Sequence, residues 1–308
     1  KPLPVDTILS EGHLVTDPKK IRTMQSLGDM QKLYALAYTY AVTGRQNYRD
    51  KARDFLLAWA KTNHGIGNPI NDTKLEPAIE AFDLLKHTLK ASDKMIVETW
   101  LKQVADQEIQ VFLSRKSNKS TYNNWHSHRI KVVGMIAYAL DDRGFQAFTD
   151  SSLRTQISKN LYPDGSGMDF EDRDALHYHI YTLEPLLKIA IVIRRATGTD
   201  FYHYLSPAAS SISKSVQFLV PFVRGEKIHR EFVNSKVSFD KKRADNKEPG
   251  YTIGAEFQPA TAVEMLSLAA YFDKSFNSIV RQLLHRDEPY PDWQLLLNAS
   301  ETRLVTQP

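Results

Sequence analysis

The 308-residue chain is predicted to be all-α, with antiparallel helix pairs that form a superhelical barrel or toroid. Apolar residues recur at intervals of three and four along most of the chain, which is the period of an amphipathic helix. Strand-like alternation is nearly absent before residue 227, and Gly and Pro separate the helical runs. No Ser/Gly-rich linker divides the chain, so we expect residues 1–308 to form one domain.

The expected elements follow from this periodicity. The first helix begins near Met24, and its apolar stripe ends at Gly44, a glycine stop; the second spans Tyr48–Trp59. Ile228–Phe239 is the best candidate for extended structure. Gly65–Thr73 and Lys241–Gly250 are predicted to be loops, either solvated connectors or ligand-contacting lids. Further helices are predicted at residues 74–90, 92–115, 124–141, 144–160, 172–197, 205–220, 258–272 and 275–285.

Charge and composition restrict the class of ligand. The net charge of +4 and the isoelectric point near 9.0 favour an anionic ligand. There is no long Lys/Arg run and no zinc-finger spacing, so nucleic acid is not the expected partner. No window reaches the ~18 apolar residues that a membrane span requires, so no membrane partner is expected.

The chain contains no cysteine, which excludes disulfides, thiolate metal sites and cysteine catalysis. This composition is compatible with an oxidising periplasm. The sequence begins Lys1-Pro2-Leu3-Pro4 without an initiator Met or an apolar stretch. We therefore expect a periplasmic or secreted protein whose signal peptide is removed.

The densest chemistry lies in two short segments that hold four of the ten histidines. The first precedes an apolar helix and reads Asn123-Asn124-Trp125-His126-Ser127-His128-Arg129. An Asn at a helix start is a natural N-cap, and the free N–H groups there attract anions. Asn124 and His126 are therefore candidates for holding a carboxylate. Arg129 either pairs with the same carboxylate or is a structural ion-pair partner, and Asn123, Trp125 and His128 are candidate contacts for the same ligand.

The second segment runs from Arg173 to Tyr181. Arg173, His177 and Tyr181 recur at i, i+4 and i+8, which predicts that they lie along one side of a single helix. Such a side would combine positive charge with groups that transfer protons. Tyr178 is the alternative to Tyr181 as the proton-transferring tyrosine. Candidate contacts for an anionic ligand are also present at Lys227, His229, Arg230, Lys241, Lys242 and Arg243.

Other chemistries are weighed against this interpretation. The two His-x-His pairs are poor metal ligands, because positions i and i+2 of a helix point about 160° apart, so we expect no metal and no cofactor. Ser-His-Asp hydrolysis is disfavoured because no G-x-S-x-G elbow is present. A helical-toroid glycoside hydrolase and a non-catalytic binder of anionic glycan remain open. Carboxylates for a glycosidase are available at Asp164, Asp169, Glu171, Asp172 and Asp174.

The sequence resembles the alginate lyase superfamily, which includes polysaccharide lyase family 5 and related uronate lyases. The resemblance is carried by the segments Asn123–Arg129, Asp164–Gly167 and Ala175–Leu186, and it is clearest over residues 120–195. It implies an incomplete (α/α) toroid with a deep cleft. The implied activity is β-elimination at a 4-linked uronic acid of alginate or polyglucuronate, without metal or organic cofactor.

The resemblance also implies roles for individual residues. Asn124 matches the family's Asn and His126 its His, although Trp125 intervenes where the family 5 pair is contiguous. Aligning Tyr181 with the tyrosine of the family's Tyr-x-Leu-x-Pro motif places the family's Arg one residue from Arg173. The resemblance thus implies that Asn124, His126 and Arg173 neutralise the carboxylate, while Tyr181, or a histidine such as His177, transfers the proton.

Overall fold

The structure, a computed structural model, describes residues 1–114 and 119–304. These residues contain helices and no β-strand; the only extended pairings among them are isolated bridges between Leu161 and Gly167 and between Arg230 and Glu256. The all-α prediction is confirmed. The chain divides into two compact units, Lys1–Thr121 with His128–Ser152 and Tyr122–Ser127 with Leu153–Pro308. None of the described helices combines the length and the apolar character needed to cross a membrane.

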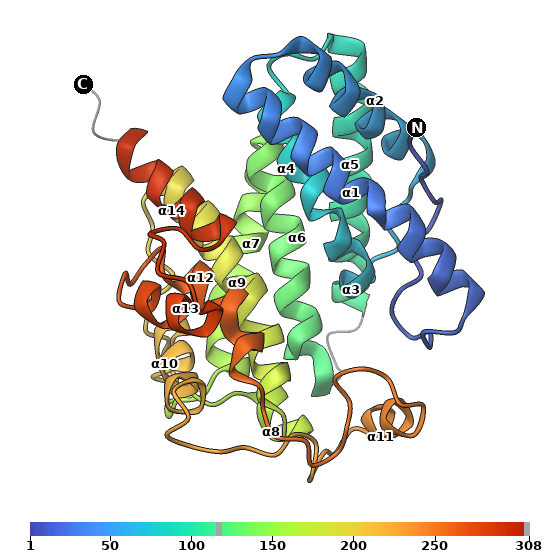
Figure 1. Ribbon diagram of the computed structural model, residues 1–308. Helices are drawn as coiled ribbons and strands as arrows, with labels where there is room; N and C mark the ends of the chain where they lie inside the picture. The colour runs from blue at the N-terminus through green and yellow to red at the C-terminus, as the bar shows by residue number, and fades with distance from the viewer. Residues whose placement is uncertain (115–118, 305–308) are drawn as a thin grey trace. The chain divides into compact units, whose positions relative to one another are not determined.

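The first unit is a bundle in which α1 packs against α2 and α4, and α2 packs against α5 (Figure 1). Helix α1 begins where the Asp17 side chain accepts a hydrogen bond from the Lys19 N–H. It ends at Gly44, whose φ of 68° is favourable for glycine, so the predicted stop is confirmed. The elements are α1 (Pro18–Thr43), α2 (Gln46–Thr62), α3 (Pro69–Asp72), η1 (Thr73–Leu75), α4 (Glu76–Leu85), α5 (Ala91–Ser114) and η2 (Lys119–Tyr122).

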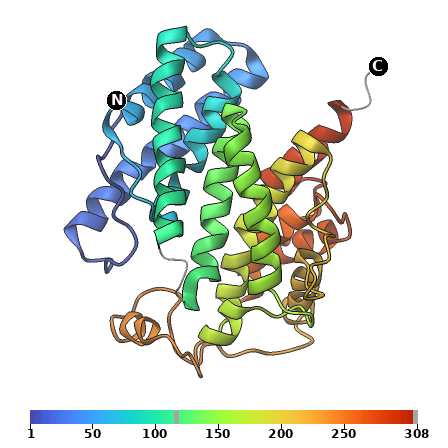
Figure 2. The ribbon, with the colours of Figure 1, turned by 180° about the vertical axis from the view of Figure 1, so that it is seen from behind.

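The second unit is organised around α9 (Leu176–Thr197), which packs against α8, α10 and α12; Figure 2 shows these helices from behind. The predicted core stripe of α9, including Leu183, Leu187 and Ala190, is fully buried. Helices α6 (Asn124–Leu140) and α7 (Arg143–Asn160) contribute residues to both units. The remaining elements are α8 (Met168–Arg173), α10 (Ile212–Val223), α11 (Ser238–Asp245), η3 (Pro259–Ala262), α12 (Val263–Ala269), α13 (Phe276–Leu284) and α14 (Trp293–Leu304).

The predicted single helix over residues 172–197 is wrong at its N-terminal end. Asp174 adopts a left-handed conformation (φ 48°, ψ 50°) that ends α8, and its carboxylate accepts hydrogen bonds from the N–H and Nδ2 of Asn234 at 2.8 and 3.0 Å. Helix α9 begins at Leu176 because the Glu231 carboxylate accepts the N–H groups of Leu176 and His177 at 2.9 and 3.2 Å. Asn234 and Glu231 are distant in sequence, so no local pattern indicates the break.

Several other expectations also differ from the structure. Ile228–Phe239 forms no strand and contributes only the bridge at Arg230. Lys241–Gly250 is helical through Asp245, because α11 starts at Ser238 and is held by tertiary contacts rather than by an apolar stripe. The predicted loop Gly65–Thr73 contains the short α3, and α10 begins at residue 212 instead of 205. Helix α14 was not predicted, and residue 115 of the predicted helix 92–115 lies outside the described residues.

Candidate active site

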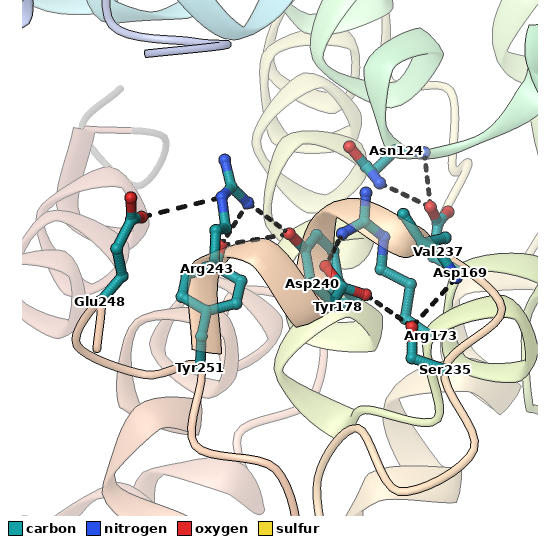
Figure 3. Close-up of polar contacts among 10 residues, drawn as sticks. All are labelled: Asn124, Asp169, Arg173, Tyr178, Ser235, Val237, Asp240, Arg243, Glu248 and Tyr251. Carbon is teal, nitrogen blue, oxygen red and sulfur yellow. Dashed lines mark hydrogen bonds and ion pairs between the residues drawn. The ribbon is translucent and has the colours of Figure 1, made fainter. Parts of the chain in front are cut away.

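Asp169 is a buried carboxylate that connects three segments of the second unit. Its Oδ1 accepts hydrogen bonds from the backbone N–H and the Nδ2 of Asn124, at 3.0 and 2.5 Å (Figure 3). Its Oδ2 accepts hydrogen bonds from Asn160 Nδ2 at 2.8 Å and Thr182 Oγ1 at 2.9 Å. Burial raises the pKa of Asp169, and these donors oppose that shift. Asp169 therefore fixes Asn124 beside α8 and next to the turn of α9 that carries Tyr181.

The polar residues at the start of α6 differ in their contacts and in their burial. Asn123, rather than Asn124, caps the helix: its Oδ1 accepts the Trp125 N–H at 3.1 Å. Trp125 is half-buried, whereas His126 is fully buried and its ring lies edge-on to Tyr122, with the centroids 5.7 Å apart. Asn124 and His126 both belong to the second unit, and both side chains are buried there.

His128 and Arg129 belong to the first unit, where both side chains are buried. Arg129 Nε donates to Glu108 Oε2 at 2.8 Å, and its guanidinium carbon lies 5.7 Å from the Phe112 ring centroid. His128 Nδ1 lies 3.2 Å from Thr73 Oγ1. Of the two interpretations of Arg129, the structural ion pair therefore accounts for its contacts.

Arg173 lies at the end of α8, one helical turn after Asp169. Its Nη1 donates to Asp240 Oδ1 at 2.5 Å, and its guanidinium carbon lies 3.7 Å from the centroid of the Tyr178 ring. Asp240 is almost fully buried and also accepts a hydrogen bond from Ser235 Oγ at 2.7 Å (Figure 3). The expectation that Arg173 shares one helix with His177 and Tyr181 is wrong, but its charge still reaches the first turn of α9.

The first two turns of α9 carry His177, Tyr178 and Tyr181. Tyr178 is only 4% exposed, and its ring lies perpendicular to that of Tyr181, with the centroids 6.2 Å apart. Burial raises the pKa of Tyr178 well above its ordinary value, so this phenol stays protonated near neutral pH. Burial, and then the charges of Arg173 and Arg243, lower the pKa of the half-buried His177, so its imidazole is neutral at pH 7. His177 and Tyr181 are both partly accessible.

Arg243 and Tyr251 complete this cluster. Arg243 Nη1 donates to the hydroxyls of Tyr178 at 2.9 Å and Tyr251 at 2.6 Å, while its Nε lies 3.8 Å from Glu248 Oε2 (Figure 3). The ring of Tyr251 lies 6.1 Å from that of His177. Sequence reasoning grouped Arg243 with neighbouring cations as a sugar contact and missed Tyr251. The only local sign of Tyr251 is its place after a Pro-Gly turn.

His229 and Arg230, predicted to contact substrate, lie near the junction between α8 and α9. His229 Nε2 lies 3.1 Å from the Asp174 carbonyl oxygen, so this side chain supports the helix break. Arg230 is exposed, and its Nη1 donates to the Gly254 carbonyl at 3.1 Å. Of the two, Arg230 is the more accessible to a ligand.

The histidine pair of α9 is divided between two environments, as its i, i+2 spacing predicts. His177 faces the tyrosine cluster, whereas the buried His179 donates from Nε2 to the Ser215 carbonyl at 2.9 Å. Burial lowers the pKa of His179 to about 4. Over residues 1–114 and 119–304, we find no group of three or more His, Asp or Glu side chains suited to a metal ion.

The carboxylates available to a glycosidase are placed in separate turns and caps. Asp164 accepts the N–H and Oγ of Ser166 at 3.0 and 2.8 Å, and Asp172 lies 3.6 Å from Lys236 Nζ. Asp169 holds Asn124, and the Asp174 carboxylate accepts Asn234, as described above. Asp164, Glu171 and Asp172 are exposed, whereas the cluster around Tyr178 combines arginine, neutral histidine and tyrosine.

The chain is similar in sequence to known alginate lyases. The sequence profile of the family described as Alginate lyase matches residues 5–229. An alginate lyase of Stenotrophomonas maltophilia is 27% identical over 189 residues, which cover 54% of this chain and 24% of the relative. An exo-oligoalginate lyase of Saccharophagus degradans is 24% identical over 220 residues, which cover 61% of this chain and 28% of the relative. The chain therefore spans about a quarter of the length of either relative.

Solved structures share the fold. An alginate lyase from Bacteroides ovatus superposes with a TM-score of 0.63 at 21% identity, covering 89% of this chain and 74% of that one. Alginate lyase A1-III from Sphingomonas species A1 gives 0.62 at 19% identity, covering 89% and 78%. A variant of A1-III complexed with a tetrasaccharide gives 0.57 at 20% identity, covering 73% and 67%. At these identities the likeness shows the fold, and the predicted helical-toroid class is confirmed.

Proposed function

Because the chain belongs to the alginate lyase family, we propose that it is a carbon–oxygen lyase that cleaves a 4-linked uronic-acid polymer by β-elimination. The observation that carries the proposal is the cluster around Tyr178. It joins two arginines, a neutral histidine and two further tyrosines. Asp169, on the same short helix as Arg173, holds Asn124. These groups match the two requirements of the reaction, which are stabilisation of negative charge and transfer of a proton.

The first requirement arises because the C5 proton of a uronate is far too weakly acidic to leave at neutral pH. Removing it places enolate-like charge on the neighbouring carboxylate. Binding that carboxylate against the partly exposed Arg173 stabilises the charge as it forms and lowers the barrier. Asn124 and His126, which are 2% and 0% exposed, add to this from behind the surface through the orientation of their dipoles. Asp169 supports this role because it fixes the orientation of the Asn124 amide.

The second requirement is proton transfer. The C5–H electron pair becomes the C4–C5 double bond, the C4–O4 bond breaks, and O4 takes up a proton. In mannuronate the C5 proton and O4 lie on the same side of the ring, so Tyr181 can serve both steps. In guluronate they lie on opposite sides, and the neutral imidazole of His177 is then the base. Tyr181 is preferred over Tyr178 because Tyr178 is nearly inaccessible.

The proposed substrate is alginate, with polyglucuronate as the alternative polymer. Two relatives are described as an alginate lyase and an exo-oligoalginate lyase, and a neighbouring structure holds a tetrasaccharide. The mild excess of positive charge suits an anionic chain, with exposed Arg230 as a contact outside the reacting sugar. We place the protein in the periplasm or outside the cell, in keeping with its lack of cysteine.

The test is to incubate the protein with polymannuronate, polyguluronate and polyglucuronate in EDTA and to follow the ultraviolet absorbance of the conjugated C4–C5 double bond. A rise in absorbance on one polymer supports the lyase. New reducing ends without absorbance indicate the glycoside hydrolase, and binding without either product indicates the non-catalytic binder. Activity that appears only without EDTA contradicts the metal-free mechanism.

A further inference from the structure

The geometry points to Tyr251 as a further catalytic residue, which in place of Tyr181 donates the proton to the departing O4 oxygen, with Arg243 as its positioning residue. The inference rests on the proposed lyase function. Neither residue lies in the two histidine-rich segments of the sequence. Arg243 lies in α11, within the range Lys241–Gly250 that is predicted to be a loop, and Tyr251 follows that range directly.

The first argument is a count of hydroxyl protons. Arg243 Nη1 carries two hydrogens, and it donates to both Tyr251 and Tyr178. The two hydroxyl oxygens lie 3.1 Å apart, so a single proton is shared between them. Two phenols bring two protons, and one proton therefore remains for an acceptor outside the pair.

Burial decides which tyrosine presents that proton. Tyr178 is 4% exposed and packs against Phe232, whereas Tyr251 is only partly buried. An outside acceptor such as a sugar oxygen therefore meets Tyr251. In this arrangement Tyr178 donates to Tyr251, and Tyr251 donates to the ligand.

The second argument concerns the phenolate that remains after Tyr251 gives up its proton. Its oxygen would accept hydrogen bonds from Arg243 and Tyr178, which already lie 2.6 and 3.1 Å away. The guanidinium carbon of Arg243 also lies 4.6 Å from the ring centroid of Tyr251. A charged donor and a second hydroxyl stabilise the anion without rearrangement, which is what a proton donor requires.

Arg243 is held firmly enough to position this pair. Its side chain is 11% exposed, and its guanidinium carbon lies 4.6 Å from the Phe239 ring centroid. Its Nε lies 3.8 Å from Glu248 Oε2 (Figure 3). The neighbouring Asp240 of α11 pairs with Arg173, so one short helix supports both arginines.

The proposed step conserves atoms and electrons. The O–H bond of Tyr251 breaks and its proton moves to O4, while the C4–O4 electron pair stays on the leaving oxygen. The C5 proton passes to the phenolate of Tyr181 or to the neutral imidazole of His177, and the C5–H pair forms the C4–C5 double bond. Water then returns a proton to the Tyr251 phenolate, and the first base releases its proton to solvent.

A leaving-group comparison tests the inference. Tyr251→Phe and the unchanged protein are assayed on the polymer and on a uronic-acid methyl glycoside that carries 4-nitrophenoxide at C4, which departs without protonation. We expect kcat on the polymer to fall about 100-fold with KM within about threefold, and kcat on the nitrophenoxide substrate to fall less than about fivefold. Tyr290→Phe, at a tyrosine that is 45% exposed, is the matched control and should change neither value.

Substitutions that keep or remove the positive charge of Arg243 test its positioning role. Arg243→Lys should keep more of kcat on the polymer than Arg243→Gln, and both should lose a smaller factor on the nitrophenoxide substrate than on the polymer, because only the protonated leaving group needs the pair. Equal losses on both substrates, or an active Tyr251→Phe variant within about threefold of the unchanged protein on the polymer, overturn this inference alone. Failure of the unchanged protein to form unsaturated product on any uronan overturns the inference and the proposed function together.

Discussion

The guanidinium carbon of Arg173 lies 3.7 Å from the centroid of the Tyr178 ring, although the left-handed Asp174 separates their helices. A cation over the face of an aromatic ring is attracted by the ring quadrupole. The same guanidinium group is paired with the nearly buried Asp240. This pairing brings α8, α9 and α11 together at one positive charge, and it yields the first prediction.

Replacing Arg173 by Gln should lower kcat/KM on the polymer about 100-fold, because a cation that stabilises the developing charge is removed. It should also destabilise the protein by about 3 kcal/mol, because Asp240 is left buried without its partner. Arg173→Gln with Asp240→Asn should recover stability in urea unfolding but not activity. Arg224→Gln, at an arginine with a 54% exposed side chain, is the control. Activity that recovers together with stability would show that Arg173 is only structural.

The two tyrosines of α9 should respond differently to loss of their hydroxyls. Tyr181→Phe should lower kcat on the polymer by about 100-fold or more, because the group that takes the C5 proton is lost. Tyr178→Phe should cost about tenfold, because Tyr251 keeps its bond to Arg243. Steady-state rates of unsaturated product formation measure both effects. A larger loss in Tyr178→Phe would reverse the assignment.

Asp169→Asn should reduce activity and stability together. The Asp169 carboxylate accepts hydrogen bonds from Asn124, Asn160 and Thr182. An amide N–H₂ group cannot accept from these donors, so the free energy of unfolding should fall by about 1–3 kcal/mol. The Asn124 amide should also lose its fixed orientation, which lowers kcat/KM. Asp164→Asn, at an exposed turn residue, is the matched comparison. If Asp169→Asn kept full kcat/KM, Asp169 would have no role in orienting Asn124.

Arg129→Met should destabilise the first unit without changing kcat for the protein that remains folded. Burial raises the pKa of Glu108 and Arg129 lowers it, so removing the cation leaves an uncompensated buried carboxyl group and costs about 3–5 kcal/mol. Arg129→Met with Glu108→Met should recover much of that loss. A fall in kcat at temperatures where the single variant is fully folded would instead place Arg129 at the substrate.

Acid should destabilise the protein through His179. Its pKa in the folded protein is about 4, below the ordinary value near 6.5, so the folded state favours the neutral imidazole. The associated stability is fully present above pH 6.5 and is lost as the pH falls toward 4, by about 3 kcal/mol in total. His179→Gln keeps an N–H donor for the Ser215 carbonyl and should lose less stability over that range. Urea unfolding at several pH values measures this, and identical pH profiles would contradict the prediction.

Some features around the site could be predicted from the sequence because they depend on residues close together in the chain. The apolar period of α9 and the Gly44 stop depend on neighbours within a few residues, and both predictions are confirmed. Polar residues are also concentrated at Asn123–Arg129 and Arg173–Tyr181, and of these Asn123–Ser127 and Arg173–Tyr181 belong to the second unit. The roles assigned to individual residues in these segments stay predictions.

Other parts depended on partners that no local pattern indicates. The break at Asp174 exists because Asn234 and Glu231 supply hydrogen bonds from more than 50 residues away. Helix α11 has no apolar stripe, so the hydrophobic period of the sequence could not predict the helix or its contacts with Arg173 and Tyr178.

The sequence by itself therefore determined the all-α class, most helices and the residue types available for the chemistry, because helical period and composition are properties of short segments. The tertiary structure decided which side chains meet. Arg129 pairs with Glu108, while Arg173 and Arg243 lie against Tyr178, because burial requires each charge to find a partner and that partner is set by the packing of distant helices.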